Sequence, residues 1–302
     1  MGLQPLQGAG PGEAKAAVTR LAIGFMWLVH FLPLQLLAKV GAAIGVLAFW
    51  LIPERRMVTR TNLAKCFPQK SPQERERLAR AHMRAFCRAF MEQGILWWSP
   101  RERIQQLVRL EGIENLQGHA KTIVFAPHFV GFEATLARLA TEYPVAMMYS
   151  RQKDPRFDAR LYAGRTRFGG VMYPRQGGIK RGIEIIDSGT LFYYLPDLDH
   201  GIKRAVFVPF FGVQAATVTG LAYIARTTGA AVVPCVTRML PAGGGYVARL
   251  YPAWRDFPSG DEHADARRMM AFVEERILEM PEQYFWLHKR FKTRPEGHAR
   301  FY

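Results

Sequence analysis

The residues best suited to chemistry in this chain are a histidine and a carboxylate five positions apart, His128 and Glu133, directly after the apolar run 122–126. On a regular helix, residues five apart point about 140° away from each other. The two can therefore meet only if His128 lies in a turn ahead of the helix that carries Glu133, and Pro127 and Gly131 suit such a turn. Glu133 would then hydrogen-bond to one ring nitrogen and leave the other to take a proton from a substrate hydroxyl.

The spacing of this pair is common by chance, so the elements around it decide its meaning. From Lys121 onward, short apolar runs alternate with helical patterns, which predicts an α/β fold with a mixed or mostly parallel sheet flanked by helices. A helix over 71–98 precedes this region, with Ser71-Pro72 as its start. The candidate strands are 122–126, 144–149, 190–195, 231–236 and 246–251, and the candidate helices are 132–141, 155–168, 179–187, 217–228 and 263–280.

Two polar segments also compete for chemical roles. The segment 151–167 holds Arg165 among five other basic residues; such a run is usually a solvated helix face, but it could clamp phosphates or a developing oxyanion. Asp197 and Asp199 follow an apolar run that ends at Tyr194, and carboxylates after a strand often face the active-site edge of an α/β sheet. With His200 they also resemble a divalent-metal cluster, although their spacing alone does not define a ligand set, and we expect no metal.

Two aromatic segments have open interpretations. The run 206–212, followed by small and hydroxylated residues at 215–219, could line an acyl-chain channel, but the pattern favours a core strand and a helix start. The stretch 281–295 interleaves aromatic and basic residues, which suits a membrane surface or a nucleic-acid groove equally.

The N-terminal region carries a membrane signal. Residues 21–52 contain one charged side chain, Lys39, and exceed the roughly 20 residues that a span needs. Pro33 divides this segment, so we expect either one membrane helix or a hairpin; a buried hairpin of the globular domain is the alternative. We expect residues 1–20 to be disordered and 53–302 to form one catalytic domain. The basic residues that follow the apolar segment place that domain on the cytoplasmic side.

Composition limits the possible partners. The chain of 302 residues has 41 Lys and Arg against 25 Asp and Glu, a net charge of +16, which indicates an acidic partner such as nucleic acid, an anionic membrane or an acidic protein. Three cysteines far apart make neither a zinc site nor a disulfide framework and favour a reducing compartment. The sequence has no nucleophile elbow, Walker loop or dinucleotide fingerprint, which argues against serine hydrolases, P-loop enzymes and classical dehydrogenases.

A series of motifs in a consistent order resembles the late acyltransferases of bacterial lipid A biosynthesis, which transfer lauroyl or myristoyl chains. The resemblance covers roughly residues 20–297, and its last stretch is long enough to be highly specific. The matching motifs are Asn62-Leu63 with Cys66-Phe67-Pro68, the His128 and Glu133 pair, Asp154-Pro155 leading to Gly164-Arg165, Leu195-Pro196-Asp197, the 206–212 run, Ala215-Ala216-Thr217 and the stretch 281–297.

The resemblance implies a fold like that of the glycerolipid acyltransferases and an enzyme of the bacterial inner membrane, with its catalytic domain on the cytoplasmic face. It implies acyl-acyl carrier protein as donor, a lipid A precursor as acceptor and no cofactor. His128 would deprotonate the acceptor hydroxyl, with Glu133 holding the ring. Arg165 or backbone amides after Gly131 would stabilise the oxyanion. Asp197 would orient Arg165 or His128 and would not act as a second base.

Two rival functions remain from the sequence. One is an acyltransferase for another acceptor, such as a glycolipid, phospholipid or aminolipid. The other, from a different class, is a basic membrane-associated nucleic-acid-binding protein. The basic residues are spread along the whole chain rather than gathered in one stripe, and a binder does not require His128 and Glu133, so we expect no nucleic-acid partner.

Overall fold

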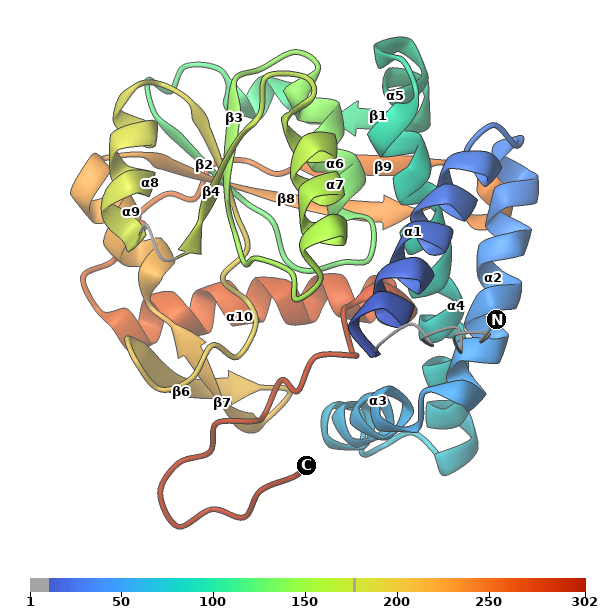
Figure 1. Ribbon diagram of the computed structural model, residues 1–302. Helices are drawn as coiled ribbons and strands as arrows, with labels where there is room; N and C mark the ends of the chain where they lie inside the picture. Colours follow the sequence, from blue (N-terminus) through green and yellow to red (C-terminus); the bar gives the residue numbers. More distant parts are fainter. Residues whose placement is uncertain (1–10, 176–177) are drawn as a thin grey trace, which may run out of the picture.

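The computed structural model describes residues 11–175 and 178–302, and a twisted seven-stranded sheet lies at its centre (Figure 1). All neighbouring strands are parallel except β8 and β9, so the sheet is mostly parallel, as the sequence predicts. The five candidate strands are confirmed, and two short edge strands, β1 and β4, add to them. In spatial order the strands are β1 (Val108–Glu111), β9 (Tyr246–Leu250), β8 (Ala231–Met239), β2 (Thr122–Phe125), β5 (Leu191–Tyr194), β3 (Val145–Tyr149) and β4 (Val171–Pro174).

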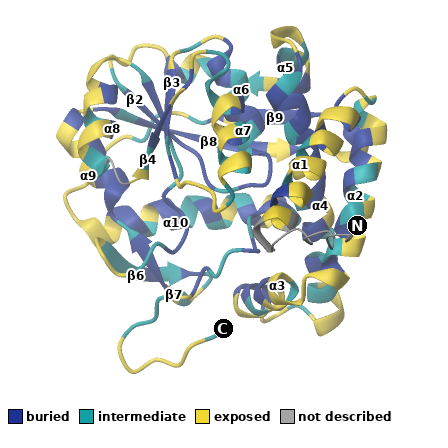
Figure 2. Ribbon diagram, in the orientation of Figure 1, coloured by how far each residue is buried: buried dark blue, intermediate teal, exposed yellow. Residues whose placement is uncertain are grey.

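Strand β2 is buried on both faces, which explains its continuous apolar sequence. Because successive side chains of a strand point to opposite faces, Ile123 and Phe125 enter one hydrophobic core and Val124 enters the other. The helices that cover these faces are α6 (Phe132–Ala140), α7 (Pro155–Thr166), α8 (Gly178–Asp187), α9 (Gly220–Thr228) and α10 (Glu262–Glu279). Figure 2 shows the buried strands between partly exposed helices.

Helix α4 (Pro72–Trp98) supports the sheet from the side on which the N-terminal helices lie (Figure 1). Its first residue follows Ser71, whose side chain accepts a hydrogen bond from the Glu74 amide at 3.2 Å, while the Ser71 amide donates to the Glu74 carboxylate at 2.7 Å. This capping box fixes the predicted helix start. The remaining short elements are α3 (Pro53–Cys66), α5 (Arg101–Leu107), η1 (Ile113–Leu116), η3 (Pro241–Gly243) and η4 (Pro281–Gln283).

The apolar N-terminal segment forms a helical hairpin, α1 (Pro11–Val29) and α2 (Leu34–Leu51), with Pro33 immediately before α2. The prediction of disorder up to residue 20 is wrong from Pro11 onward, because α1 packs on the domain through buried residues such as Ala16 and Met26; residues 1–10 lie outside the described part. Helix α2 runs against α4 at backbone contact, since a Cβ on Gly45 would stand 2.6 Å from the Cα of Arg84.

The segment 205–218 differs from the predicted helix start. It forms an antiparallel hairpin, β6 (Ala205–Phe210) and β7 (Val213–Val218), and α9 begins only at Gly220. Thr217 is buried in β7, where its backbone pairs with Val206 of β6, so the helix cannot begin at 217. The hairpin packs on α10, so most of this segment is core rather than an acyl-chain channel.

Candidate active site

The order of the strands brings His128 and Asp197 together. β2 and β5 are parallel neighbours, so their carboxyl ends lie at the same edge of the sheet, and each is followed by a short loop that carries one of these residues. The Ala126 amide donates to the Tyr194 carbonyl at 2.9 Å, which extends the pairing to the start of both loops. The sequence prediction of a histidine in a turn between β2 and α6 is confirmed.

Asp197 is the hydrogen-bond partner of His128. One carboxylate oxygen lies 2.7 Å from Nδ1 of the ring, and the other accepts the His128 backbone N–H at 3.0 Å. Asp197 is fully buried, and burial by itself acts to raise its pKa. The nearby imidazole and the two hydrogen bonds from His128 outweigh burial, and the pKa of Asp197 lies below its usual value. The carboxylate therefore stays ionised and holds the ring by Nδ1–H, which leaves Nε2 as the acceptor.

Glu133 does not contact the ring as the sequence suggested. It pairs with Arg165 on α7, whose Nε donates to one carboxylate oxygen at 3.0 Å and whose Nη2 donates to the other. Both side chains are about nine-tenths buried. Glu133 lies in the first turn of α6 and points toward α7, whereas His128 lies before the helix and points toward β5. The expected partner of His128 is thus corrected from Glu133 to Asp197.

Aromatic rings from two segments hold the imidazole in place. The Phe285 ring stacks on His128 at 6.3 Å between centroids and 23° between planes, and Phe132 meets it edge-on at 5.5 Å. The Phe285 amide also donates to the His128 carbonyl at 2.9 Å, and the Val130 amide donates to the Gln283 carbonyl at 2.8 Å. The turn after β2 is therefore fixed by the backbone of the segment that follows α10.

This C-terminal stretch is largely interior, so neither predicted surface role of 281–295 holds for most of it. Tyr284, Trp286 and Phe291 are fully buried. Arg290 is 1% exposed and donates to the Ala216 carbonyl at 2.9 Å and the Thr217 hydroxyl at 3.0 Å, which places its charge under the β6–β7 hairpin. The basic and aromatic residues of 281–295 thus belong to a largely buried, hydrogen-bonded C-terminal segment.

Asp199 has a local structural task. Its carboxylate accepts hydrogen bonds from the Thr293 amide at 2.6 Å, the Thr293 hydroxyl at 2.8 Å and the Gly201 amide at 2.9 Å. Within residues 11–175 and 178–302, no three His, Cys, Asp or Glu side chains are grouped as metal ligands. Asp199 therefore links the C-terminal segment 281–295 to the loop after β5 through Thr293.

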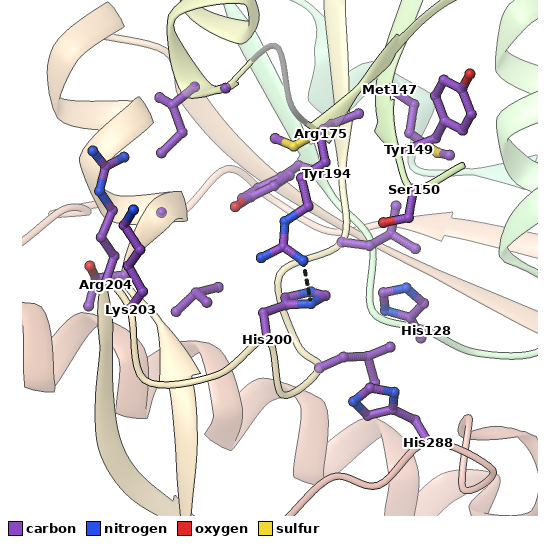
Figure 3. Close-up of a pocket in the computed structure, with 18 of the residues that line it drawn as sticks. His128, Met147, Tyr149, Ser150, Arg175, Tyr194, His200, Lys203, Arg204 and His288 are labelled. Atoms are coloured by element: carbon purple, nitrogen blue, oxygen red, sulfur yellow. Dashed lines mark hydrogen bonds between the residues drawn. The ribbon is translucent and has the colours of Figure 1, made fainter. Parts of the chain in front are cut away.

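A cavity of about 1150 Å³ opens over His128 (Figure 3). Its lining includes His128, apolar side chains such as Phe132, Met147 and Leu198, and several basic side chains. Of the basic residues in 151–167, Arg165 reaches this cavity, together with three cationic residues that the sequence reasoning did not single out, Arg175, Lys203 and Arg204. Arg175 could have been found from the sequence, because it follows strand β4 at the sheet edge where His128 lies. Lys203 and Arg204 lie in a loop, and no sequence pattern marked them.

A second, smaller cavity of about 220 Å³ lies between α4, α6 and α7. Its lining is mainly phenylalanine and aliphatic, with Ala89, Phe90 and Phe157 among the contributors. Phe132, Gln152, Arg165 and Phe285 line both cavities, so the two spaces adjoin at the Glu133–Arg165 pair.

The mostly parallel sheet thus carries a histidine held by a carboxylate, and this histidine lines a partly apolar cavity. The family model for the bacterial lipid A biosynthesis acyltransferases matches residues 13–293, and the chain belongs to this family. The resemblance noted from the motifs is confirmed.

Several relatives cover nearly the whole chain. A lipid A biosynthesis lauroyltransferase of Escherichia coli strain K12 is 35% identical over 285 residues, covering 93% of both chains. A palmitoleoyltransferase of the same pathway and organism is 30% identical over 290 residues, covering 94% of both, and a myristoyltransferase is 32% identical over 276 residues, covering 88% of this chain and 83% of the relative. The crystal structure of a 1-acyl-sn-glycerophosphate acyltransferase from Thermotoga maritima gives a TM-score of 0.40 at 18% identity, covering 80% of this chain and 97% of the other.

Proposed function

We propose that this acyltransferase moves a fatty acyl chain from acyl-acyl carrier protein to a hydroxyl group of a lipid A precursor, as a late step of lipid A acylation. The observation that carries the proposal is that His128, held by the buried Asp197, lines a large and partly apolar cavity. Membership of the family supplies the acyl-transfer chemistry and the lipid A pathway. The donor and the hydroxyl acceptor are our inference from the site.

His128 acts as general base. Nε2 accepts the proton of the acceptor hydroxyl as its oxygen attacks the thioester carbonyl, and Asp197 stabilises the imidazolium that forms. Collapse of the tetrahedral intermediate breaks the carbon–sulfur bond, and the imidazolium returns its proton to the leaving thiolate. The products are an ester and a free thiol, and no covalent enzyme intermediate is required.

Stabilisation of the oxyanion falls best to the start of α6. Helix N-termini present N–H groups to an anion. The Phe132 and Ala134 amides already donate to the Phe129 and Gly131 carbonyls, whereas the Gly131 and Glu133 amides have no acceptor among the described residues and are the ones we assign to the oxyanion. Arg165 directs Nε and Nη2 to Glu133, so the bidentate face of its guanidinium is already engaged. We therefore assign Arg165 and Glu133 to positioning α7 against α6, in place of the direct roles in catalysis expected from the sequence.

The acyl chain has a place in the smaller cavity. A chain that enters beside His128 and passes Phe132 reaches this apolar space between α4 and α7. The donor protein fits the charge of the enzyme, because acyl carrier protein is strongly acidic and the chain carries +16.

The inner membrane is the proposed partner of the N-terminal hairpin. Helix α2 is long and apolar enough to span a bilayer, with mean hydropathy 1.8, and 28% of that span is buried in the protein. Large side chains of the hairpin face outward, among them Leu28 at 62%, Leu47 at 61% and Leu51 at 76% exposure. Such an apolar surface suits lipid better than water. The basic residues after α2 support attachment at the cytoplasmic face.

Attachment is tested by replacing Leu28, Leu47 and Leu51 together with glutamate. These side chains are outside the core, so the domain should fold and move from the membrane fraction to the soluble fraction after alkaline washing. Replacing exposed Arg109, Arg238 and Arg249 of the sheet region with glutamine is the control. If the glutamate variant stayed in the washed membranes, the hairpin would not be the anchor.

The function itself is tested with purified enzyme, a panel of acyl-carrier donors and a panel of acceptors, with products identified by mass spectrometry. We expect one added acyl group, esterified to the lipid A precursor, and no product with phospholipid or aminolipid acceptors. Efficient acylation of one of those acceptors, with none on the lipid A precursor, would contradict the proposed acceptor. Transfer from acyl-coenzyme A but not from acyl-acyl carrier protein would contradict the proposed donor.

A further inference from the structure

Three cations line the active-site cavity without a carboxylate partner among the described residues: Arg175, Lys203 and Arg204. Glu262 is the acidic residue among those lining the same cavity, so these groups leave an excess of two positive charges there. The fourth cation, Arg165, is neutralised by Glu133. Cations facing a partly apolar cavity are stabilised when an anion enters with them.

Arg175 is held in a defined direction. It follows β4, at the same edge of the sheet as His128, and its Nη1 donates to Nδ1 of His200 at 3.1 Å (Figure 3). Burial, reinforced by the nearby charges of Arg175 and His128, lowers the pKa of His200 to about 4. His200 is therefore neutral at pH 7, where it accepts a hydrogen bond from the guanidinium without cancelling its charge. Within residues 11–175 and 178–302, the other N–H groups of Arg175 have no hydrogen-bond acceptor and can bind a ligand.

Lys203 and Arg204 reach the cavity from the loop between β5 and β6, and Figure 3 shows both side chains extending into it. Arg204 has φ of 57°, in the left-handed region that non-glycine residues rarely adopt. Its carbonyl accepts the Thr219 amide at 3.1 Å, and Thr219 also lines the cavity. The backbone is thus fixed in an uncommon conformation that presents two neighbouring cations on one side of the space.

We propose that Arg175, Lys203 and Arg204 form a subsite for a phosphate group of a substrate. The inference rests on the proposed function, in which both substrates carry phosphate: the acceptor is a phosphorylated glycolipid, and the prosthetic arm of the donor contains a phosphodiester. A guanidinium and an ammonium that line one cavity suit phosphate, because its several oxygens can each accept a charge-assisted hydrogen bond. Binding there would fix the distance between the phosphate and the reacting atom beside His128, which is the hydroxyl oxygen of the acceptor or the thioester carbon of the donor.

The test measures KM and kcat for Arg175→Gln, for the double variant Lys203→Gln/Arg204→Gln and for Arg226→Gln. Arg226 is exposed on α9, past the residues of that helix that line the cavity. Arg226→Gln therefore removes the same charge as Arg175→Gln, but outside the cavity. We expect both subsite variants to raise one KM by about 10–100-fold, the effect of one or two charge-assisted hydrogen bonds, with kcat within a few-fold. Arg175→Lys should recover part of the loss, and Arg226→Gln should change little.

Paired substrates identify the source of the phosphate. If the acceptor phosphate binds, the KM defect disappears with a dephosphorylated acceptor, on which the wild type and Arg175→Gln become equal. If the donor phosphodiester binds, the KM for acyl-acyl carrier protein rises and the acceptor phosphate makes no difference. Equal KM values for the wild type and both subsite variants, with every substrate, would overturn the subsite.

A binding measurement separates this inference from the proposed function. Inorganic pyrophosphate, used as the probe, should raise the thermal unfolding midpoint of the wild type and of Arg226→Gln more than that of the subsite variants. This result would support the subsite even if the wild type transferred no acyl chain to lipid A precursors. An equal rise in all variants would overturn it even in an active enzyme. Should Arg175→Gln fail to fold, the Lys203→Gln/Arg204→Gln variant carries both measurements.

Discussion

His128 and Asp197 are 69 residues apart in the chain, yet one carboxylate holds both the ring and the amide of the same histidine. The double contact fixes the tautomer and the direction of the ring, since rotation of the side chain would break the Nδ1 bond while the amide bond keeps the carboxylate in place. Phe285 and Phe132 restrict the same ring from its face and edge. As the proposed base, a ring held in this way would lose little freedom when the acceptor binds.

The Glu133–Arg165 pair is predicted to act as a structural unit. Each side chain is about 90% buried, so Arg165→Met leaves a buried carboxylate without its partner and should cost on the order of 3 kcal/mol in the free energy of unfolding. The double variant Glu133→Gln/Arg165→Met removes both charges and should recover much of the stability and part of kcat. Chemical denaturation and single-turnover assays measure the two quantities, with exposed Arg156→Met as the control.

Full recovery of stability with kcat still reduced 10²-fold or more would show that the Arg165 guanidinium acts on the reaction itself, as the sequence suggested. At this scale the sequence singled out four residues that the structure places in two hydrogen-bonded pairs, but it paired His128 with Glu133 instead of Asp197. The spacing of His128 and Glu133 invited a local contact, while the contact with Asp197 depends on β2 and β5 being neighbours, and strand order cannot be read from a single periodic pattern.

At the scale of elements, the proposed site lies at the sheet edge after β2 and β5, and the segment 281–287 is hydrogen-bonded to the turn that follows β2. The buried strands and the amphipathic helices could be predicted because burial on one or two faces leaves a clear pattern. The edge strands β1 and β4 are no shorter than β2 and β5, but they are partly exposed and therefore lack a continuous apolar run. The buried charge of Arg290 hid the interior position of the C-terminal stretch, since arginine usually marks a surface.

Helix α4 is predicted to limit the length of the acyl chain. Ala89 lines the smaller cavity, so Ala89→Leu should fill part of it and exclude the end of a long chain. We expect kcat/KM for the longest accepted donor to fall at least 10-fold relative to a donor shorter by two carbons, because a methylene group is worth about 1–3 kcal/mol in such a pocket. Ala85→Leu, on the same helix outside the lining residues, is the control. An unchanged donor preference in Ala89→Leu would place the chain elsewhere.

At the scale of the whole molecule, buried histidines should make the fold sensitive to acid. Burial lowers the pKa of His82, His200 and His288 to about 4, against 6.5 for an unfolded histidine. Between pH 6.5 and 4 the unfolded chain therefore binds more protons than the folded one, and stability falls as the pH is lowered through this window. The stability gained from keeping these histidines neutral is fully present above pH 6.5. For His82 alone the loss by pH 4 is about 3 kcal/mol.

The check is the thermal unfolding midpoint at pH 7.5 and pH 5. His82→Gln keeps a donor for the Glu282 carbonyl, which accepts from His82 Nδ1 at 2.9 Å, and should lose less stability between the two pH values than the wild type. His119→Gln at the exposed surface should behave as the wild type does. An identical acid response in His82→Gln and wild type would exclude His82 as a cause.

The charge and the apolar hairpin act at the same scale. A net charge of +16 and an exposed apolar surface on α1 and α2 suit an enzyme that meets an acidic donor in solution and a lipid acceptor in the bilayer. Both features could be predicted from composition. The packing of α2 on α4 could not, because close contact at Gly45 is a property of the assembled helices.

The central claim is that His128, held by Asp197, is the base for acyl transfer, and single-turnover transfer from acyl-acyl carrier protein to a lipid A precursor tests it most directly. We predict that His128→Ala and Asp197→Asn, shown to be folded by their unfolding midpoints, lose about 10²–10⁴ in the rate of the chemical step. Glu133→Gln should lose less, because its carboxylate contacts Arg165 and not the ring. Near-wild-type transfer by folded His128→Ala would contradict the claim. So would near-wild-type transfer by Asp197→Asn together with a large loss of rate in Glu133→Gln.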